Sequence, residues 1–135
     1  MKKLIFFLLA VFMMVMITSC SLESKLDGSW INISNEAGIY TRINLRFMNN
    51  TSRGSVCGGR VSLSESGDFA NDVFVSSELA QEPYILDGDQ LTLNLGGYIN
   101  GTYTEFFVGT YTAEIKNKQL TLTDKAGNSI TFDKE

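Results

Sequence analysis

Residues 111–132 read YTAEIKNKQLTLTDKAGNSITF, and this stretch decides the fold class. Apolar side chains occupy every second position within three short segments, which is the period of a β-strand with one buried and one solvent-exposed face. The segments are separated by residues 116–118 and 124–128, whose lengths and residue types are those of hairpin turns. The carboxyl-terminal part of the chain is therefore predicted to be a meander of antiparallel strands.

The same alternation recurs upstream, at Leu91, Leu93 and Leu95 and again between residues 42 and 47. From Trp30 onward we expect no helix, and about eight to ten strands in all, because strand-forming residues are frequent throughout. An antiparallel sheet of that size usually curls shut or splits into a sandwich. The expected fold is all-β, a single antiparallel meander that closes into a small barrel, with a β-sandwich as an alternative. The expected strands are 29–34, 40–48, 55–63, 71–76, 83–86, 90–95, 102–108, 109–115, 119–123 and 129–133.

Charge and composition exclude several classes of protein. The chain has 15 acidic and 11 basic residues, a formal net charge of −4, and no His. A nucleic-acid partner is not expected, because neutralising phosphates requires a basic surface. Without His, the usual general base and the commonest transition-metal ligand are both missing, so we expect no enzyme. Residues 61–115 contain no Lys or Arg, which indicates a solvated acidic surface or a patch for a cationic partner or divalent ions.

The amino terminus has the organisation of a secretory signal peptide. Lys2 and Lys3 precede an uncharged apolar run over residues 4–17, which is short for a membrane span. The tetrad Ile17-Thr18-Ser19-Cys20 follows and resembles the bacterial lipobox, in which an aliphatic and two small residues precede an invariant Cys. The resemblance implies a signal peptide over residues 1–19 and lipid attachment at Cys20, the first residue of the mature protein.

Lipidation of this kind implies a protein of the bacterial cell envelope. Several acyl chains on Cys20 hold a protein on a membrane far more firmly than one chain does. In the lipoproteins that this amino terminus resembles, an Asp directly after the Cys favours the inner membrane, and here that residue is Ser21. We therefore expect the cell outer membrane, with the membrane leaflet left open. Residues 20–27 are expected to form the lipidated Cys and a short tether, and residues 28–135 the folded domain.

Leu26-Asp27-Gly28-Ser29-Trp30 opens the expected domain. This stretch resembles the Leu-x-Gly-x-Trp start of lipocalin-like small bacterial lipoproteins, and the rhythm of strands and turns continues from it. The resemblance implies a lipocalin-like barrel in which Gly28 permits a tight entry to the first strand and Trp30 closes one end. In that family an Arg of the last strand lies over the Trp. No Arg follows Arg60 here, and Lys134 is the residue that could take this place.

Residues 53–60 read RGSVCGGR and contain the second cysteine, Cys57. The flanking Arg53 and Arg60 could lower the pKa of the thiol and make it reactive. We favour a small buried side chain on a strand, with the glycines supplying a bulge; an intermolecular disulfide is the third possibility. The stretch is also similar to the Gly-Cys-Asn turn of META-type domains, which leaves a META-like compact β domain as an alternative fold.

Glycines and aromatic residues gather in residues 96–107. Tyr98, Tyr103 and Phe106 could rim a ligand pocket, with ring bodies inside and hydroxyls at the mouth, or they could belong to the core of a filled barrel. The first interpretation predicts a non-catalytic barrel that binds a small apolar ligand through these residues, or an envelope protein partner. The alternative is a structural or interaction lipoprotein with a filled barrel and no small-molecule ligand.

Two acidic stretches have a partial likeness to metal sites. Asp87-Gly88-Asp89 has the carboxylate spacing of a calcium loop, but the remaining ligands of such a loop are missing, so a hairpin turn is expected. Asp68 and Asp72 could hold an ion, although carboxylates in loops are usually solvated. We expect no metal and no cofactor. No catalytic residue is assigned either, because the many Ser and Thr residues have no His to activate them.

Overall fold

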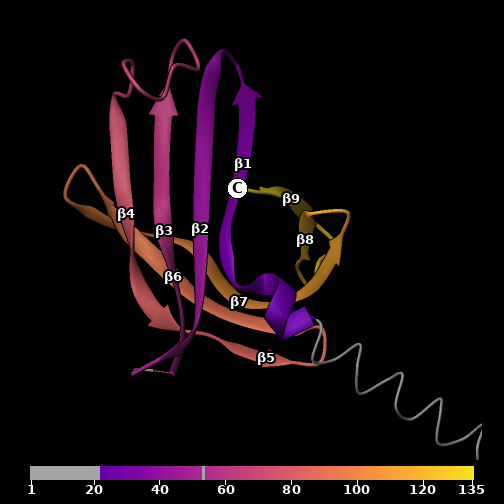
Figure 1. Cartoon of the computed structure of the whole chain (residues 1–135). Coiled ribbons are helices and arrows are strands. Elements are labelled where there is room, and N and C mark those ends of the chain that lie inside the picture. Colours follow the sequence, from indigo (N-terminus) through magenta and orange to yellow (C-terminus); the bar gives the residue numbers. More distant parts are fainter. Residues whose placement is uncertain (1–21, 53) are drawn as a thin grey trace, which may run out of the picture.

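The computed structural model describes residues 22–52 and 54–135, and these residues form an all-β fold. Antiparallel strands follow one another as a meander that nearly closes into a barrel (Figure 1). The predicted fold class is thereby confirmed. The strands are β1 (Gly28–Glu36), β2 (Ile39–Thr51), β3 (Gly54–Ser64), β4 (Val75–Pro83), β5 (Ile85–Asp87), β6 (Gln90–Ile99), β7 (Thr102–Lys116), β8 (Gln119–Thr123) and β9 (Ser129–Lys134).

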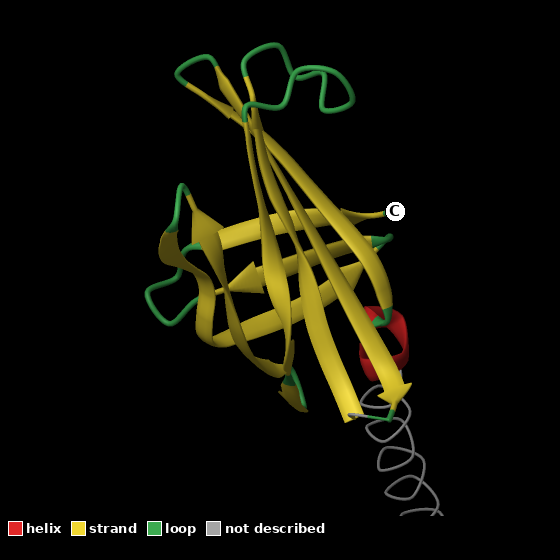
Figure 2. Cartoon of the chain, turned by 90° about the vertical axis from the view of Figure 1, so that its left-hand side faces the viewer, coloured by secondary structure: helices red, strands yellow, loops and turns green. Residues whose placement is uncertain are grey.

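The first and last strands of the chain are neighbours, in the order β4-β3-β2-β1-β9-β8-β7-β6-β5. β1 pairs with β2 along its whole length, but it pairs with β9 only at Trp30 and Ile31. The far halves of β1 to β4 therefore extend past the barrel as a sheet of their own. Figure 2 shows this tip and its loops rising above the shorter strands.

The barrel closes between β4 and β6 by packing rather than by a hydrogen-bonded ladder. The two strands lie against each other but are not neighbours in the sheet. Gly97 on β6 permits the approach, because a Cβ there would come within 2.4 Å of the Ser77 hydroxyl oxygen and 2.5 Å of the Glu78 carbonyl oxygen. Ser77 is buried, and among the described residues its hydroxyl has no hydrogen-bond partner. We call this line of contact the β4–β6 seam.

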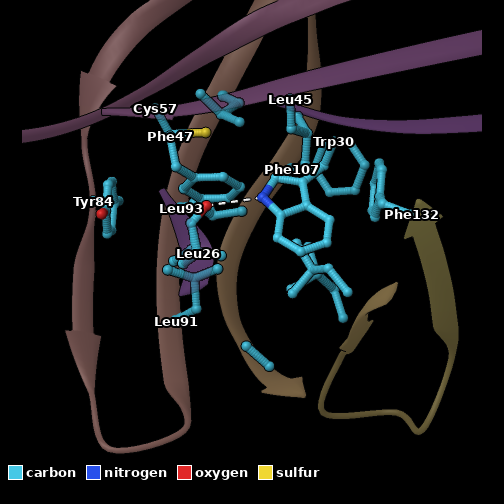
Figure 3. Close-up of a cluster of buried hydrophobic side chains, with 14 of the residues drawn as sticks. Leu26, Trp30, Leu45, Phe47, Cys57, Tyr84, Leu91, Leu93, Phe107 and Phe132 are labelled. Carbon is cyan, nitrogen blue, oxygen red and sulfur yellow. Dashed lines mark hydrogen bonds between the residues drawn. The ribbon is translucent and has the colours of Figure 1, made fainter. Parts of the chain in front are cut away.

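Apolar side chains fill the inside of the barrel. Figure 3 shows Trp30, Phe47 and Phe132 gathered with leucines that come from several strands. The ring centres of Phe107 and Phe132 lie 6.1 Å apart, as aromatic neighbours in a core do. The completely or almost completely buried apolar residues, with less than 2% exposure, are Leu26, Trp30, Leu45, Phe47, Cys57, Leu91, Leu93, Leu95, Leu120, Leu122 and Phe132. Burial of these side chains is the main source of the stability of the fold.

A helical turn at residues 22–26 belongs to the folded domain (Figure 2). Leu26 has no exposed surface, and its carbonyl oxygen accepts a hydrogen bond from the Trp30 indole N–H at 2.8 Å (Figure 3). Asn49 holds the same segment: its backbone N–H donates to the Asp27 carboxylate and its side-chain amide to the Glu23 carbonyl. The expectation of a tether over residues 20–27 is wrong at Leu26, because this side chain fills one end of the core.

The last strand holds a lysine over the buried tryptophan. The Lys134 Nζ lies 4.5 Å from the ring centre of Trp30 and donates hydrogen bonds to the carbonyl oxygens of Lys25 and Asp27. Gly28 makes this possible, because its φ of +118° is rare for other residues and a Cβ there would lie 2.8 Å from the Lys134 Nζ. Gly28, Trp30 and Lys134 thus meet at one end of the barrel.

Three strand predictions differ from the structure. The segment expected as a strand at 71–76 is mostly loop, and β4 begins only at Val75. The strand expected at 83–86 is the shorter β5, because Pro83 ends β4. The strands expected at 102–108 and 109–115 are one strand, β7. A bulge at Phe106 shifts the register of β7 against β6 without ending either strand.

Candidate functional site

The aromatic residues proposed to bind a ligand do not line the barrel interior together. Tyr98 and Tyr103 are 66% and 53% exposed, and their rings pack against each other on the outside, with ring centres 5.4 Å apart. Phe106 is partly buried against the core. The expected interior position of the two tyrosines is wrong, because Gly97 takes the inward position at the seam. Tyr98 follows it and points outward, and Tyr103 is its cross-strand partner.

Cys57 is a core residue. It has no exposed surface, and burial raises the pKa of its thiol from 9.0 to about 12. The thiol is therefore protonated at neutral pH and closed off from reagents. The favoured prediction of a buried side chain on a strand is confirmed, and the prediction of a reactive thiol is wrong. Of the two arginines that suggested reactivity, Arg53 lies outside the described residues and Arg60 is exposed.

The acidic loop at residues 65–74 is braced by its own carboxylates. The Asp68 carboxylate accepts hydrogen bonds from the side-chain amide of Asn71 and the backbone N–H of Ala70, and these bonds lower its pKa. The Asp72 carboxylate accepts a hydrogen bond from the Ser66 N–H at 3.0 Å. Within residues 22–52 and 54–135, no three His, Cys, Asp or Glu side chains gather in a way that could hold a metal ion.

A groove of about 760 Å³ lies on the outer face of β2, β3 and β4. Leu45 of β2 points into the core, so the alternate residues Arg42, Asn44 and Arg46 point to the opposite face, where they line the groove. Its volume is in the range of sites that bind small molecules or short segments, about 300–1,000 Å³. We call it the arginine groove, because all three described arginines line it.

The pairing of β2 with β3 brings the three arginines together. Arg60 of β3 lies directly opposite Asn44 of β2, and Arg42 and Arg46 are two residues to either side of Asn44. Cross-strand diagonal neighbours on one face are close enough for long side chains to interact. The two neighbours of Arg60 on the same face of β3 are Gly58, opposite Arg46, and Ser62, opposite Arg42, and both line the groove. The cluster therefore follows directly from the register of one hairpin.

Two of these three positive charges are paired with carboxylates of the described chain, and the third is not. Arg60 forms an ion pair with Glu78 at 2.7 Å, between side chains that are 57% and 78% exposed. Arg42 lies 3.9 Å from the Glu135 carboxylate, which also accepts a hydrogen bond from Asn44. Arg46 forms no ion pair with any described residue. Exposed pairs contribute only about 0–1 kcal/mol, so a ligand can displace them at little cost.

The braced loop forms one end of the arginine groove. Phe69 from this loop packs on Arg42, whose guanidinium carbon lies 5.9 Å from the ring centre. The Ser64 hydroxyl oxygen accepts a hydrogen bond from the Gly67 N–H at 2.9 Å and so ties the loop to the end of β3. Met48 lines the groove near the other end of β2. The groove is thus largely formed in advance, which reduces the ordering cost of binding.

Comparisons with protein-family models, with curated proteins and with solved structures found no match to this chain.

The predicted lipid anchor, Cys20, lies outside the described residues, as does the signal peptide over residues 1–19. In the part of the chain that the structure describes, no helix is long and apolar enough to cross a membrane.

Sequence reasoning missed the arginine groove, although its elements were visible. The alternation of Arg42, Asn44 and Arg46 predicted a solvent-exposed face, and nothing in the sequence alone showed what else lay on that face. The missing information was the register that sets Arg60 against Asn44. A bulge between Met48 and Thr51 shifts this register, so that counting back from the turn would not give it.

Proposed function

We propose that this protein is a lipid-anchored lipoprotein of the bacterial outer membrane, whose filled barrel binds an anionic partner through the arginine groove. The observation that carries the proposal is the gathering of Arg42, Arg46 and Arg60 on one outer face of a chain with net charge −4. Guanidinium groups match carboxylates and phosphates in shape and charge. The partner is an envelope molecule on the outside of the barrel, and binding is non-catalytic.

The packed interior supports an outer site over an internal one. The positions that a ligand inside a barrel would need are taken by Trp30, Phe47, Phe132 and their leucine neighbours, all almost completely buried. A small apolar ligand would have to displace such side chains, and interiors of this kind are close-packed. The exposed tyrosines Tyr98 and Tyr103 are left as a second surface for an envelope partner.

Lipid attachment at Cys20 is supported by the position of the motif directly after the apolar run. The lipocalin-like assignment is supported by the meeting of Gly28, Trp30 and Lys134, with a lysine in the place of the family's arginine. If Cys20 carries the acyl chains, only Ser21 separates it from the turn that begins at residue 22. Two residues span at most about 7 Å, so the barrel is held close to the membrane surface.

Anchor and groove are tested separately. Cys20→Ala should abolish incorporation of labelled fatty acid and release the protein from the membrane fraction. For the groove, labelled hexaglutamate should bind the whole wild-type chain in neutral detergent, and Arg46→Gln should weaken binding roughly fivefold. Lys125→Gln, which removes a positive charge from the turn between β8 and β9, is the matched control and should bind as the wild type does.

Each result has a clear opposite. Continued labelling of the Cys20→Ala variant would remove the anchor from the proposal. Equal weakening by Lys125→Gln and Arg46→Gln would mean that only overall charge matters and that the groove is not a site. Absence of binding by the wild type would leave the alternative function, a structural or interaction lipoprotein with a filled barrel and no ligand.

A further inference from the structure

We infer that the arginine groove binds an extended acidic polypeptide segment that carries carboxylates at every second residue. This inference rests on the proposed function and deepens it, because it names the chemistry of the partner. It is drawn from the spacing of the three arginines, from what lies at the two ends of the groove, and from the carboxylates that now pair with the arginines.

The spacing of the arginines is that of an extended chain. Arg42 and Arg46 are four residues apart on one face of β2, which places their Cα atoms about 13 Å apart. Arg60 is paired with Asn44, midway between them and one strand to the side. Along the direction of β2, the three arginines therefore recur at intervals of about 6.5 Å.

An extended peptide has the same interval on each of its faces. Its side chains alternate between two faces, so residues 1, 3 and 5 point the same way and recur about every 6.5 Å. If the peptide lies along β2 with that face toward the sheet, its carboxylates fall against Arg42, Arg60 and Arg46 in turn. A single phosphate or carboxylate ion would satisfy only part of this arrangement.

The two ends of the groove are apolar, which suits a polypeptide better than a bare polyanion. Phe69 packs on Arg42 at one end, and Met48 lines the other. Met48 is six positions after Arg42 along β2, a distance of about 20 Å. An extended segment of about seven residues fits this length, with one apolar side chain against Phe69 or Met48.

The carboxylates that now hold the arginines show that the groove accepts this chemistry. Glu78 reaches Arg60 from the neighbouring strand, and Glu135 approaches both Arg42 and Asn44. Each supplies one exposed carboxylate, whereas an alternating peptide supplies three from one molecule. The two glutamates are therefore internal competitors, and removing Glu78 should strengthen binding.

The test compares two peptides of identical composition with the whole chain in neutral detergent. One carries Glu at positions 1, 3 and 5 and Leu at position 7, with Ser between them, so that all four side chains face the groove; the other contains the same seven residues with the three Glu consecutive. Fluorescence anisotropy of the labelled peptides should give at least about fivefold tighter binding for the alternating peptide. Arg60→Gln and Arg46→Gln should each weaken it about fivefold, Glu78→Gln should tighten it, and Lys125→Gln should leave it unchanged. Added salt should weaken it.

The outcomes distinguish this inference from the proposed function. If both peptides bind equally and Arg46→Gln weakens both, the groove is an anion site without register, and only the further inference fails. If neither peptide binds but inorganic pyrophosphate protects Arg46 from modification by phenylglyoxal, the partner is a phosphate compound and the inference is again wrong. If no anion binds to a chain whose far-ultraviolet circular dichroism is that of the wild type, both fail.

Discussion

Replacing Leu26 by Ala tests whether the helical turn at residues 22–26 is part of the fold. Leu26 has no exposed surface and lies beside Trp30 at the end of the core. Leu→Ala changes at such sites cost about 2–5 kcal/mol, the lost transfer free energy plus that of the cavity. We expect the free energy of unfolding to fall by about 3 kcal/mol, a large part of the roughly 5–15 kcal/mol typical of a domain.

Urea unfolding followed by Trp30 emission measures this effect. With an m-value of about 1.5 kcal/mol per M, a loss of 3 kcal/mol lowers the midpoint by about 2 M urea. Leu22→Ala is the matched control, because Leu22 belongs to the same turn but is only partly buried; its midpoint should move much less. Equal midpoints for the wild type and Leu26→Ala would refute this reasoning, and would mean that residues 20–27 are a tether that does not stabilise the domain.

Three further outcomes are expected. The free energy of unfolding that the buried, protonated Cys57 thiol contributes is complete below pH 9.0. Between pH 9.0 and 12 it falls by up to about 1.4 kcal/mol per pH unit, because the unfolded chain loses the thiol proton first. The free energy of unfolding of Cys57→Ala, measured by chemical denaturation, should therefore decrease less with pH over this range than that of the wild type. Gly97→Ala should lower the free energy of unfolding by about 1–3 kcal/mol, measured by chemical denaturation, and Gly96→Ala by less. The two nearest atoms to a Cβ at Gly96 belong to the exposed Tyr103 side chain, which can move, and the nearest backbone oxygen is 2.9 Å away there against 2.5 Å at Gly97. Lys134→Gln should cost about 1 kcal/mol and make Trp30 emission easier to quench; an unchanged spectrum and midpoint would mean that the contact contributes nothing.

The sequence predicts best where turns are short and one face of each strand is apolar. β8 was predicted with its observed bounds, and β9 within one residue, because the turns on either side allow one register. Asp87 and Gln90 pair across the hairpin between β5 and β6, so the turn expected at Asp87-Gly88-Asp89 is confirmed and a calcium loop is not formed. Local pattern was sufficient for these elements.

Prediction failed where the position of a residue is determined by contact with a strand that is distant in the sequence. Ser77 occupies an inward position of β4 because β6 packs closely against it at Gly97, and this interrupts the apolar alternation that would have revealed the strand. Tyr98 was expected inside because it is the large residue in this stretch, but the inward position is taken by its neighbour Gly97. The arginine groove was missed because it depends on which residues of β2 and β3 face each other. Register and seam are tertiary properties, and single strands do not carry them.

The β4–β6 seam is the line along which the barrel can open locally. Elsewhere in the barrel, separating neighbouring strands breaks ladder hydrogen bonds, but parting β4 from β6 breaks only contacts such as that between Gly97 and Ser77. Openings that break the fewest interactions are the most frequent in the native state. In deuterium exchange, the amides of β4 that face the seam and those of β5, the other edge strand, should therefore exchange before those of β8 and β9. Glu78 and Arg60 move together in such an opening, because the ladder that joins β3 to β4 stays intact.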